Sequence, residues 1–429
     1  MSYQEQVWQW EETVSSHLPH LSRPQAYVLA CWSSALITLK SVGQTQVSLW
    51  LAWMLGGKMS AWRQRLREWC YEACAKQGAQ RQQVQVQQCF APLLSWLLSW
   101  WQSQERRLVL VLDASSLGER LTVLSVSVVY RGAAIPVAWH LRTTGTPGAW
   151  EPLWEGLISQ IAGAVPANWT VLVMADRGLY SRGLYQAVCL QGWHPFFRLS
   201  AHGMVRQHGR DDYQPLTSLQ PTAAGEVWSG RVTCFQRERQ LETTLLVART
   251  AGYDQTWFVV TDLQEQQSEL AWYAMRFWIE VGFKQFKRGG WQWHHSKMTQ
   301  PQRVERYWVV MVVTILWTVS VGEYGEQALP ASSLEQLPPT HVARRKATGR
   351  PQPASLSQFT LGRLWLLRAM MQGEAIPRGH FVPAPWPDHL PTPQRRRKPK
   401  HHKKSQAQRR RWQRQRRARN KAGKKNLPL

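Results

Sequence analysis

The segment from residue 272 to 290, WYAMRFWIEVGFKQFKRGG, has the composition of a buried helix but carries a line of polar side chains. These side chains recur every three or four positions, at Tyr273, Arg276, Glu280, Lys284 and Lys287. On an α-helix they fall within a stripe roughly 80° wide, and large apolar residues occupy the other directions. An ordinary amphipathic helix has a broad polar face instead. The pattern predicts either ion pairs along a half-buried helix or a polar line that faces a cleft holding an anionic group.

Two aspartates follow apolar runs that are typical of buried strands. Asp113 ends RRLVLVLD and Asp176 ends NWTVLVMAD, so each is expected to be the last residue of a strand. Either one alone would be interpreted as a turn-capping carboxylate. In a mixed α/β sheet, however, side chains at strand ends point into the crevice where ligands bind. Together with Glu280 they would form a group of three carboxylates, and such groups repel one another unless cations neutralise them.

Carboxylate oxygens of this kind select Mg²⁺ or Mn²⁺. Two such ions, about 3.5–4 Å apart, can activate water or a 3′-hydroxyl on one side of a phosphate and stabilise the leaving oxygen on the other. The three acidic side chains therefore predict metal-dependent phosphoryl-transfer chemistry.

The elements that must position these residues follow a definite order between residues 106 and 200. Three strand-like segments come first, then a helix, a strand, a second helix and a fifth strand. This order is expected of an RNase H-like α/β core. Residues from about 200 to 262 then contain further strand candidates, EVWSGRVTCF, QLETTLLVAR and TWFVVTDL, and predict a β-rich insertion between the fifth strand and the polar helix.

The rest of the chain divides by composition. Residues 1–100 are predicted to form an all-helical domain, in which a Gly-Gly turn separates two helices and the second carries Arg63, Arg65 and Arg67. Such a pair could be a DNA-binding helix-turn-helix or an ordinary helical hairpin. The catalytic domain is expected over 101–322, with the insertion inside it. A Pro-rich linker (323–358), a C-terminal helical segment (359–390) and a disordered basic tail (391–429) complete the prediction.

The net charge of +26 and pI near 10.4 favour a polyanionic partner. Residues 391–429 contain 17 Lys or Arg and no acid, which leaves +9 for the first 390 residues. Such a tail cannot bury enough apolar surface to fold, and it is expected to bind a phosphate backbone without reading sequence. A purely solubilising role, RNA or an anionic membrane would also account for its charge.

Six cysteines show no zinc pattern, and no secretory signal begins the chain. We therefore expect reduced thiols in a cytosolic protein. The most apolar run, residues 307–322, is short for a bilayer span and is predicted to be a core helix.

The spacing Tyr273-x2-Arg276-x3-Glu280-x6-Lys287 resembles, without a gap or substitution, the Tyr-Arg-Glu-Lys signature of the insertion-sequence-four family of DD(E) transposases. LVLDASSL and VLVMADRGLY are similar to the first and second Asp blocks of that family, which also has a β-rich insertion at this place. The resemblance covers residues 106 to about 322, or half the chain.

The resemblance implies a role for each matching residue. Asp113, Asp176 and Glu280 would be the catalytic triad, which would bind two Mg²⁺ or Mn²⁺ ions. Tyr273, Arg276 and Lys287 would contact phosphates near the cleaved end, since Arg offers a bidentate fork, Lys a point charge and Tyr a hydroxyl donor. Lys284 lies on the same stripe outside the signature, as a secondary phosphate contact or an ion-pair partner of Glu280.

Trp257 lies in the strand-like segment before the signature. In family members that cut by a hairpin route, a Trp at such a place stacks on a base flipped out of the duplex, a contact worth about 1–3 kcal/mol. The chain has 26 Trp, so packing in the core is the alternative.

The expected function is that of a DNA transposase of an insertion sequence. It would bind the terminal inverted repeats, cleave them by two-metal-ion hydrolysis and join the 3′-hydroxyl ends to target DNA by transesterification. Its partners would be double-stranded DNA and, by analogy, further copies of the chain in a homodimer or larger synaptic assembly. We expect no membrane partner and a location in the bacterial cytoplasm, at the nucleoid. The alternatives are an RNase H-like nuclease or resolvase without strand transfer and a catalytically inactive DNA-binding derivative.

Overall fold

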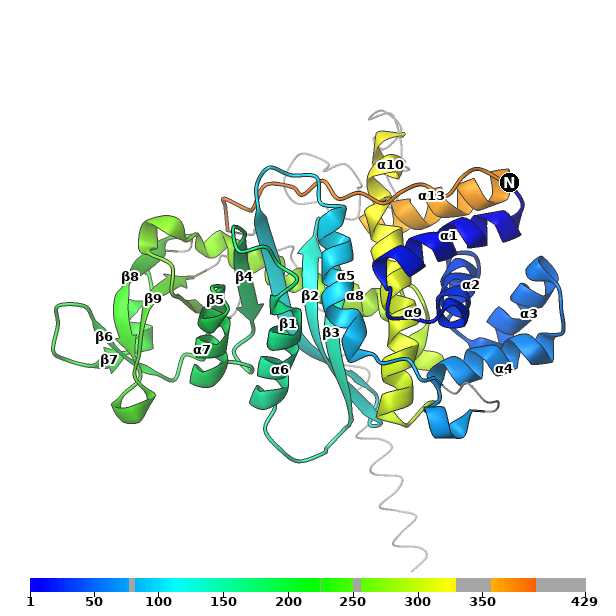
Figure 1. Ribbon diagram of the computed structural model, residues 1–429. Coiled ribbons are helices and arrows are strands. Elements are labelled where there is room, and N and C mark those ends of the chain that lie inside the picture. Colours follow the sequence, from blue (N-terminus) through cyan, green and yellow to red (C-terminus); the bar gives the residue numbers. More distant parts are fainter. Residues whose placement is uncertain (77–81, 224, 250–255, 329–355, 391–429) are drawn as a thin grey trace, which may run out of the picture.

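The computed structural model describes residues 1–76, 82–223, 225–249, 256–328 and 356–390. Helices from the N-terminal part pack at one end, a long twisted sheet lies beside them, and the strands after residue 200 extend it away from the helices (Figure 1). Most of the predicted Pro-rich linker and all of the predicted disordered tail lie outside the described residues.

The first five strands form the predicted RNase H-like core. Their spatial order is β3-β2-β1-β4-β5. β1, β2 and β3 pair antiparallel, β4 pairs parallel with β1, and β5 pairs parallel with β4. Every residue of β2 is buried, as expected of a strand covered on both faces. The bounds are β1 Arg107–Leu117, β2 Leu121–Tyr130, β3 Ala133–Thr143, β4 Thr170–Ala175 and β5 His194–Arg198.

The predicted β-rich insertion is present and continues the same sheet. β10 pairs antiparallel with β5, and the order then runs β10-β9-β8-β6-β7, so the described strands form one ten-stranded sheet. The insertion thereby covers the edge that β5 would otherwise expose. Its strands are β6 Met204–Gln207, β7 Gln214–Pro215, β8 Val227–Cys234, β9 Leu241–Ala248 and β10 Trp257–Thr261.

Helices cover both faces of the core sheet. α6 and α7 lie on the near face in Figure 1, and α8 lies behind it. The core helices are α5 Gln87–Ser99, α6 Glu151–Ala162, α7 Arg182–Leu190, α8 Trp278–Phe286, α9 Pro301–Ser320 and α10 Gly322–Gln327. Short 3₁₀ helices are η1 Ala73–Ala75, η2 Leu216–Leu219, η3 Arg237–Arg239, η4 Glu265–Gln267, η5 Leu270–Phe277 and η6 Trp293–His295.

The N-terminal part contains α1 Tyr3–His17, α2 Arg23–Leu39, α3 Gln44–Leu55 and α4 Met59–Cys70. Gly56 and Gly57 separate α3 from α4 and both have positive φ, a backbone conformation that glycine adopts at little cost. The predicted helix, Gly-Gly turn and second helix are thus present. Arg63, Arg65 and Arg67 are exposed on α4.

The described C-terminal part begins at residue 356 and includes α13 Gln358–Gln372. Residues 373–390, which we call the C-terminal segment, then run back along α1 and over the sheet (Figure 1). Gln9 of α1 exchanges two hydrogen bonds with the backbone of Ile376. Phe381 bonds to the backbone at Trp100 and Gln102. The C-terminal segment therefore ties the N-terminal helices to the catalytic core.

The apolar run predicted to be a core helix forms most of α9. Pro301–Gln327 is long and apolar enough to cross a membrane, which corrects the expectation that the run is too short. Its most apolar window, however, is entirely buried inside the protein. That position agrees with the predicted core helix.

Candidate active site

The two aspartates lie side by side on neighbouring parallel strands. Leu112 of β1 pairs with Ala175 of β4, so Asp113 and Asp176 are the next residue on each strand. β4 ends at Ala175, whereas β1 continues past Asp113 because its later residues pair with β2. The prediction that Asp113 is the last residue of its strand is therefore wrong.

Arg276 lies between all three predicted carboxylates. Its Nη2 is 3.2 Å from Asp113 Oδ2 and 3.6 Å from Asp176 Oδ2, and its Nη1 is 3.9 Å from Glu280 Oε1. The Arg276 side chain is only 8% exposed, whereas that of Glu280 is 49% exposed. The structure therefore brings the three acidic residues to one place and sets a buried guanidinium among them.

The segment that supplies Arg276 and Glu280 is two helices, which corrects the prediction of a single one. The 3₁₀ helix η5 ends at Phe277, and α8 begins at Trp278. In a 3₁₀ helix residues three apart lie directly above one another, so Tyr273 and Arg276 share one side of η5. The roughly 80° stripe, which assumes 100° per residue throughout, does not apply across this junction.

Burial and charge act against each other at Asp113. Burial raises the pKa of Asp113, the Arg276 guanidinium and the Ala114 N–H lower it, and the carboxylates of Asp176 and Glu280 raise it. The Ala114 N–H donates to Asp113 Oδ1 over 2.8 Å. The net shift is upward, so the positive charge present does not fully offset the cost of burying this carboxylate.

The donor set fits a hard divalent cation. Asp176 Oδ1 and Arg276 Nε are both buried with no hydrogen-bond partner in the described part of the chain. An acceptor left unsatisfied beside two other carboxylates is a suitable ligand for Mg²⁺ or Mn²⁺. In the described residues no group of three His, Cys, Asp or Glu is close enough to hold an ion as placed. Arg276 provides the positive charge at this point.

Tyr273 and Trp257 both face the core. Tyr273 is 0% exposed, and its hydroxyl donates to the carbonyl of Ala175, the residue before Asp176, over 3.2 Å. Trp257 is 1% exposed and packs edge-on against the Tyr273 ring at 5.3 Å. Trp257 is thus in the core-packing position that the sequence left open, and its face is not available to a flipped base in this conformation. The predicted phosphate contact of Tyr273 likewise needs a different conformation from this one.

The two lysines differ in their surroundings. Lys287 follows α8, and its Nζ donates to Ser115 Oγ and to the Ser116 carbonyl, each over 2.8 Å. Ser115 is two residues after Asp113 on β1, so it shares a face with Asp113. Lys284 is exposed. Glu280 forms its ion pair with Arg276.

Arg198 is a site residue that the sequence interpretation missed. It ends β5, its side chain is 13% exposed, and its Nη1 lies 3.7 Å from Asp176 Oδ1. The available signal was a single charged residue in the apolar run HPFFRLS, next to a strand that ends in an aspartate.

α8 approaches β3 closely enough to require a glycine. A Cβ placed on Gly282 would lie 2.8 Å from the Ala134 Cβ and 3.1 Å from its carbonyl oxygen. Since Gly282 is two residues after Glu280, this close packing sets the position of Glu280 relative to the sheet.

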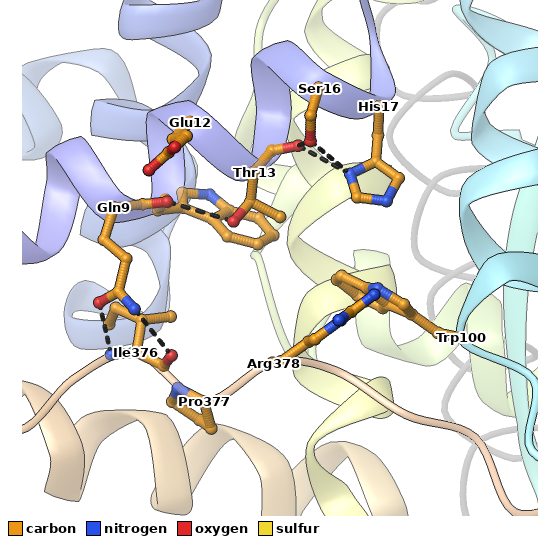
Figure 2. A pocket seen from close by; sticks show the side chains of 10 residues that line it. Gln9, Glu12, Thr13, Ser16, His17, Trp100, Ile376, Pro377 and Arg378 are labelled. Atoms are coloured by element: carbon orange, nitrogen blue, oxygen red, sulfur yellow. Dashed lines mark hydrogen bonds between the residues drawn. The ribbon is translucent and has the colours of Figure 1, made fainter.

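A cavity of about 410 Å³ lies away from the carboxylates, between α1 and the C-terminal segment. Figure 2 shows Gln9 reaching from α1 to Ile376 across one side of it. His17 lines another side and stacks on Trp96 at 4.6 Å. The residues that line it are structural partners of the C-terminal segment, so we place the chemistry at Asp113, Asp176 and Glu280.

Part of the chain that carries this site matches the model of a known protein family. Residues 118–317 match the model of the family described as "Transposase DDE domain". The chain carries a DDE transposase domain. This DDE transposase domain includes Asp176 and Glu280 within the matched range, and Asp113 lies just before it. The matched range, 200 of the 429 residues, supports a DDE transposase enzyme.

The chain is also similar to a solved structure of a piggyBac transposase in a synaptic complex with hairpin DNA. The TM-score is 0.36 at 11% sequence identity, with 76% of this chain and 75% of that chain covered. No curated protein matched this chain.

Proposed function

We propose that this chain is a transposase of the insertion-sequence-four family. It binds the terminal inverted repeats of its element, cleaves them by metal-assisted phosphodiester hydrolysis and joins the 3′-hydroxyl ends to target DNA. The observation that carries the proposal is the convergence of Asp113, Asp176 and Glu280 around Arg276 within 3.2–3.9 Å, in a chain with a transposase DDE domain.

The three carboxylates would hold the divalent cations. When bound, these ions would polarise the attacking water or 3′-hydroxyl and stabilise the leaving oxygen. Asp113 and Asp176 approach from adjacent strands and Glu280 from α8, so the backbone fixes their spacing before DNA arrives. Such pre-positioning lowers the cost of ordering the site during the reaction.

The remaining site residues position and neutralise this group. Tyr273 holds the end of β4 through its bond to Ala175 and so orients Asp176. Arg276 offsets the carboxylate charge and would turn its guanidinium to a DNA phosphate when cations take over that role. Lys287 holds the strand segment after Asp113 through Ser115 and supplies a positive charge beside it.

We also propose that α4 contacts DNA. Arg63, Arg65 and Arg67 are exposed on this helix, and Arg65 packs over the Trp62 ring at 4.8 Å, which restrains it on the surface. Trp53, near the end of α3, is 71% exposed and adjoins this helix pair. Arginine on an exposed second helix is suited to phosphate and base-edge contacts.

The assembly that acts would contain paired DNA ends and at least two copies of the chain, in the bacterial cytoplasm at the nucleoid. The basic composition of the chain supports the DNA partner.

The test is Mg²⁺-dependent cleavage of a labelled duplex that carries the DNA flanking this gene, with wild type compared with Glu280→Gln. Cuts at the element ends that disappear in the variant, followed by joining to a second duplex, are the expected result. Cutting without joining would favour a nuclease or resolvase. Equal DNA binding by both proteins with no cutting by either would favour an inactive DNA-binding protein.

A further inference from the structure

The loop that follows α8, residues 287–298, is held in one conformation by tight backbone packing. A Cβ on Gly289 would lie 2.9 Å from the Lys284 carbonyl oxygen, so the chain can turn back on α8 only with a glycine there. Trp291 and Trp293 are fully buried and anchor the loop in the core. Gln292, between them, has φ of 58°, an uncommon conformation for a residue with a side chain. Backbone strain of this kind persists only where the surrounding structure imposes it.

Two further contacts fix this loop against β1. Arg120, in the turn after β1, donates to the carbonyl of Ser296 over 2.8 Å. At the other end of the loop, Lys287 bonds to Ser115 Oγ. Ser115 lies two residues beyond Asp113 on the same face of the strand, a separation of roughly 7 Å. The Lys287 end of the 287–298 loop therefore lies close to the strand segment that follows Asp113, and the Ser296 end is attached to the turn after that strand.

This loop presents positive charge and no negative charge. Between residues 284 and 298 the chain has no Asp or Glu, and Arg288, His295 and Lys297 are exposed. The His294 and His295 rings lie 4.0 Å apart, and His294 Nδ1 is buried without a hydrogen-bond partner in the described part of the chain. Desolvation and the positive charges of His295, Arg288 and Lys287 lower the pKa of His294.

We propose that the 287–298 loop is a second phosphate-binding site, at which Arg288, His294, His295 and Lys297 bind the DNA backbone next to the phosphodiester being cleaved. This inference rests on the proposed function. Of the residues in this loop, only Lys287 belongs to the Tyr-Arg-Glu-Lys spacing. The proposed phosphate contacts are therefore additional to that signature.

The geometry suits a phosphodiester. Arginine and lysine bind phosphate as a fork and as a point charge, and a histidine N–H can donate to a phosphate oxygen. Because the loop is already ordered by Trp291, Trp293 and Arg120, binding would not require its backbone to be ordered again. The DNA strand would then be held on one side by this loop and on the other by the carboxylate group.

The test compares two charge-matched double variants of the full chain. Arg288→Gln with Lys297→Gln alters the loop, and Arg23→Gln with Arg210→Gln removes the same charge from exposed positions elsewhere. Each is titrated without Mg²⁺ against a fluorescein-labelled duplex carrying the DNA that flanks the gene, over a range of salt concentrations. Far-ultraviolet circular dichroism and thermal melting verify that each variant is folded.

For the loop variant, the slope of log K against log salt should fall by about 2, since each phosphate contact contributes about 0.9. The control should keep the wild-type slope. Ethylation of phosphates next to the cleavage site should weaken binding by wild type and control but not by the loop variant.

Equal slopes and equal ethylation patterns in both variants would overturn the loop site while leaving transposase activity intact, because wild-type cleavage is measured separately. A wild type that binds no duplex would overturn the loop site together with the proposed function.

Discussion

The Nη2 of Arg276 lies 3.2 Å from Oδ2 of Asp113, and the same guanidinium reaches Asp176 and Glu280. The buried guanidinium of Arg276 is thus close to all three acidic side chains. Arg198 also pairs with Asp176, so two guanidiniums face three carboxylates and this group retains one excess negative charge. That excess makes the site ready to accept divalent cations.

Arg276→Gln should destabilise the metal-free protein, because it leaves Asp113, the most buried of the three carboxylates, without its guanidinium partner. We expect a loss of about 1–3 kcal/mol in the free energy of unfolding, measured by urea denaturation in EDTA. Added Mg²⁺ should stabilise this variant more than it stabilises wild type. Equal stabilisation by Mg²⁺ in both proteins would show that Arg276 and the divalent cations do not neutralise the same carboxylates.

Asp113→Ala and Asp176→Ala should each abolish cleavage of the flanking-DNA duplex and leave end binding largely intact. Gel-shift and cleavage assays on the same protein preparations measure both properties. Asp388→Ala changes an exposed residue of the C-terminal segment, is the control and should cut as wild type does. Loss of DNA binding in a folded Asp113 variant would contradict the separation of binding from chemistry.

Gly282→Ala should push α8 away from β3, since the added Cβ would lie 2.8 Å from the Ala134 Cβ. Overpacking of this kind costs about 1–3 kcal/mol, and the resulting shift of Glu280 should lower the cleavage rate. The matched control is Gly156→Ala in α6, where a Cβ meets nothing within 4 Å. That change should raise stability by about 0.5–1 kcal/mol. Thermal melting and cleavage rates distinguish the two, and a Gly282 variant that behaves like the Gly156 variant would refute the close-packing argument.

Tyr273→Phe should remove the hydrogen bond to Ala175 and keep the ring against Trp257. The expected cost in unfolding free energy is about 0.5–1.5 kcal/mol. If the hydroxyl orients Asp176 through the β4 backbone, the cleavage rate should fall while DNA affinity stays near that of wild type. A large loss of DNA affinity would instead indicate that Tyr273 reaches a phosphate in the complex.

His17 should make stability depend on pH. Burial lowers the pKa of His17 below 6.5. The bond to the Thr13 carbonyl opposes this shift, and the positive charge of Arg378 adds to it. The unfolded chain therefore binds this proton more tightly, so stability is lost as the pH falls through 6.5 toward the lower folded value. Glu12 and Arg378 also line this cavity.

The variant His17→Phe keeps a ring against Trp96 and cannot titrate. Between about pH 7.5 and about pH 5.5, urea denaturation should show a smaller loss of stability for His17→Phe than for wild type. The same loss in both proteins would assign the pH dependence to other groups.

Much of the catalytic core could be predicted because its signals are local. Apolar runs that end in Asp113 and Asp176 predict two buried strands, and the order of the elements predicts the RNase H-like sheet. The pairing of β10 with β5 could not be predicted, since it depends on contacts between segments far apart in the chain. Neither could the change from η5 to α8 at Phe277, because side-chain periodicity is similar in both kinds of helix over so short a length.

The contacts of Arg276 in the site could likewise be predicted only in part from the sequence. Its spacing from Glu280 suggested either an ion pair or a phosphate contact, and only the three-dimensional structure shows that it also reaches Asp113 and Asp176. Arg198 was missed for the same reason, because its partner Asp176 is on another strand.

The C-terminal segment also affects how the protein can be made. The bonds between Gln9 and Ile376 join residues 367 positions apart, so α1 cannot complete its packing until nearly all of the chain has left the ribosome. Contacts this distant form late and slow the final stage of folding. The catalytic core, whose strands lie closer together in sequence, can assemble before the N-terminal helices are fixed against it.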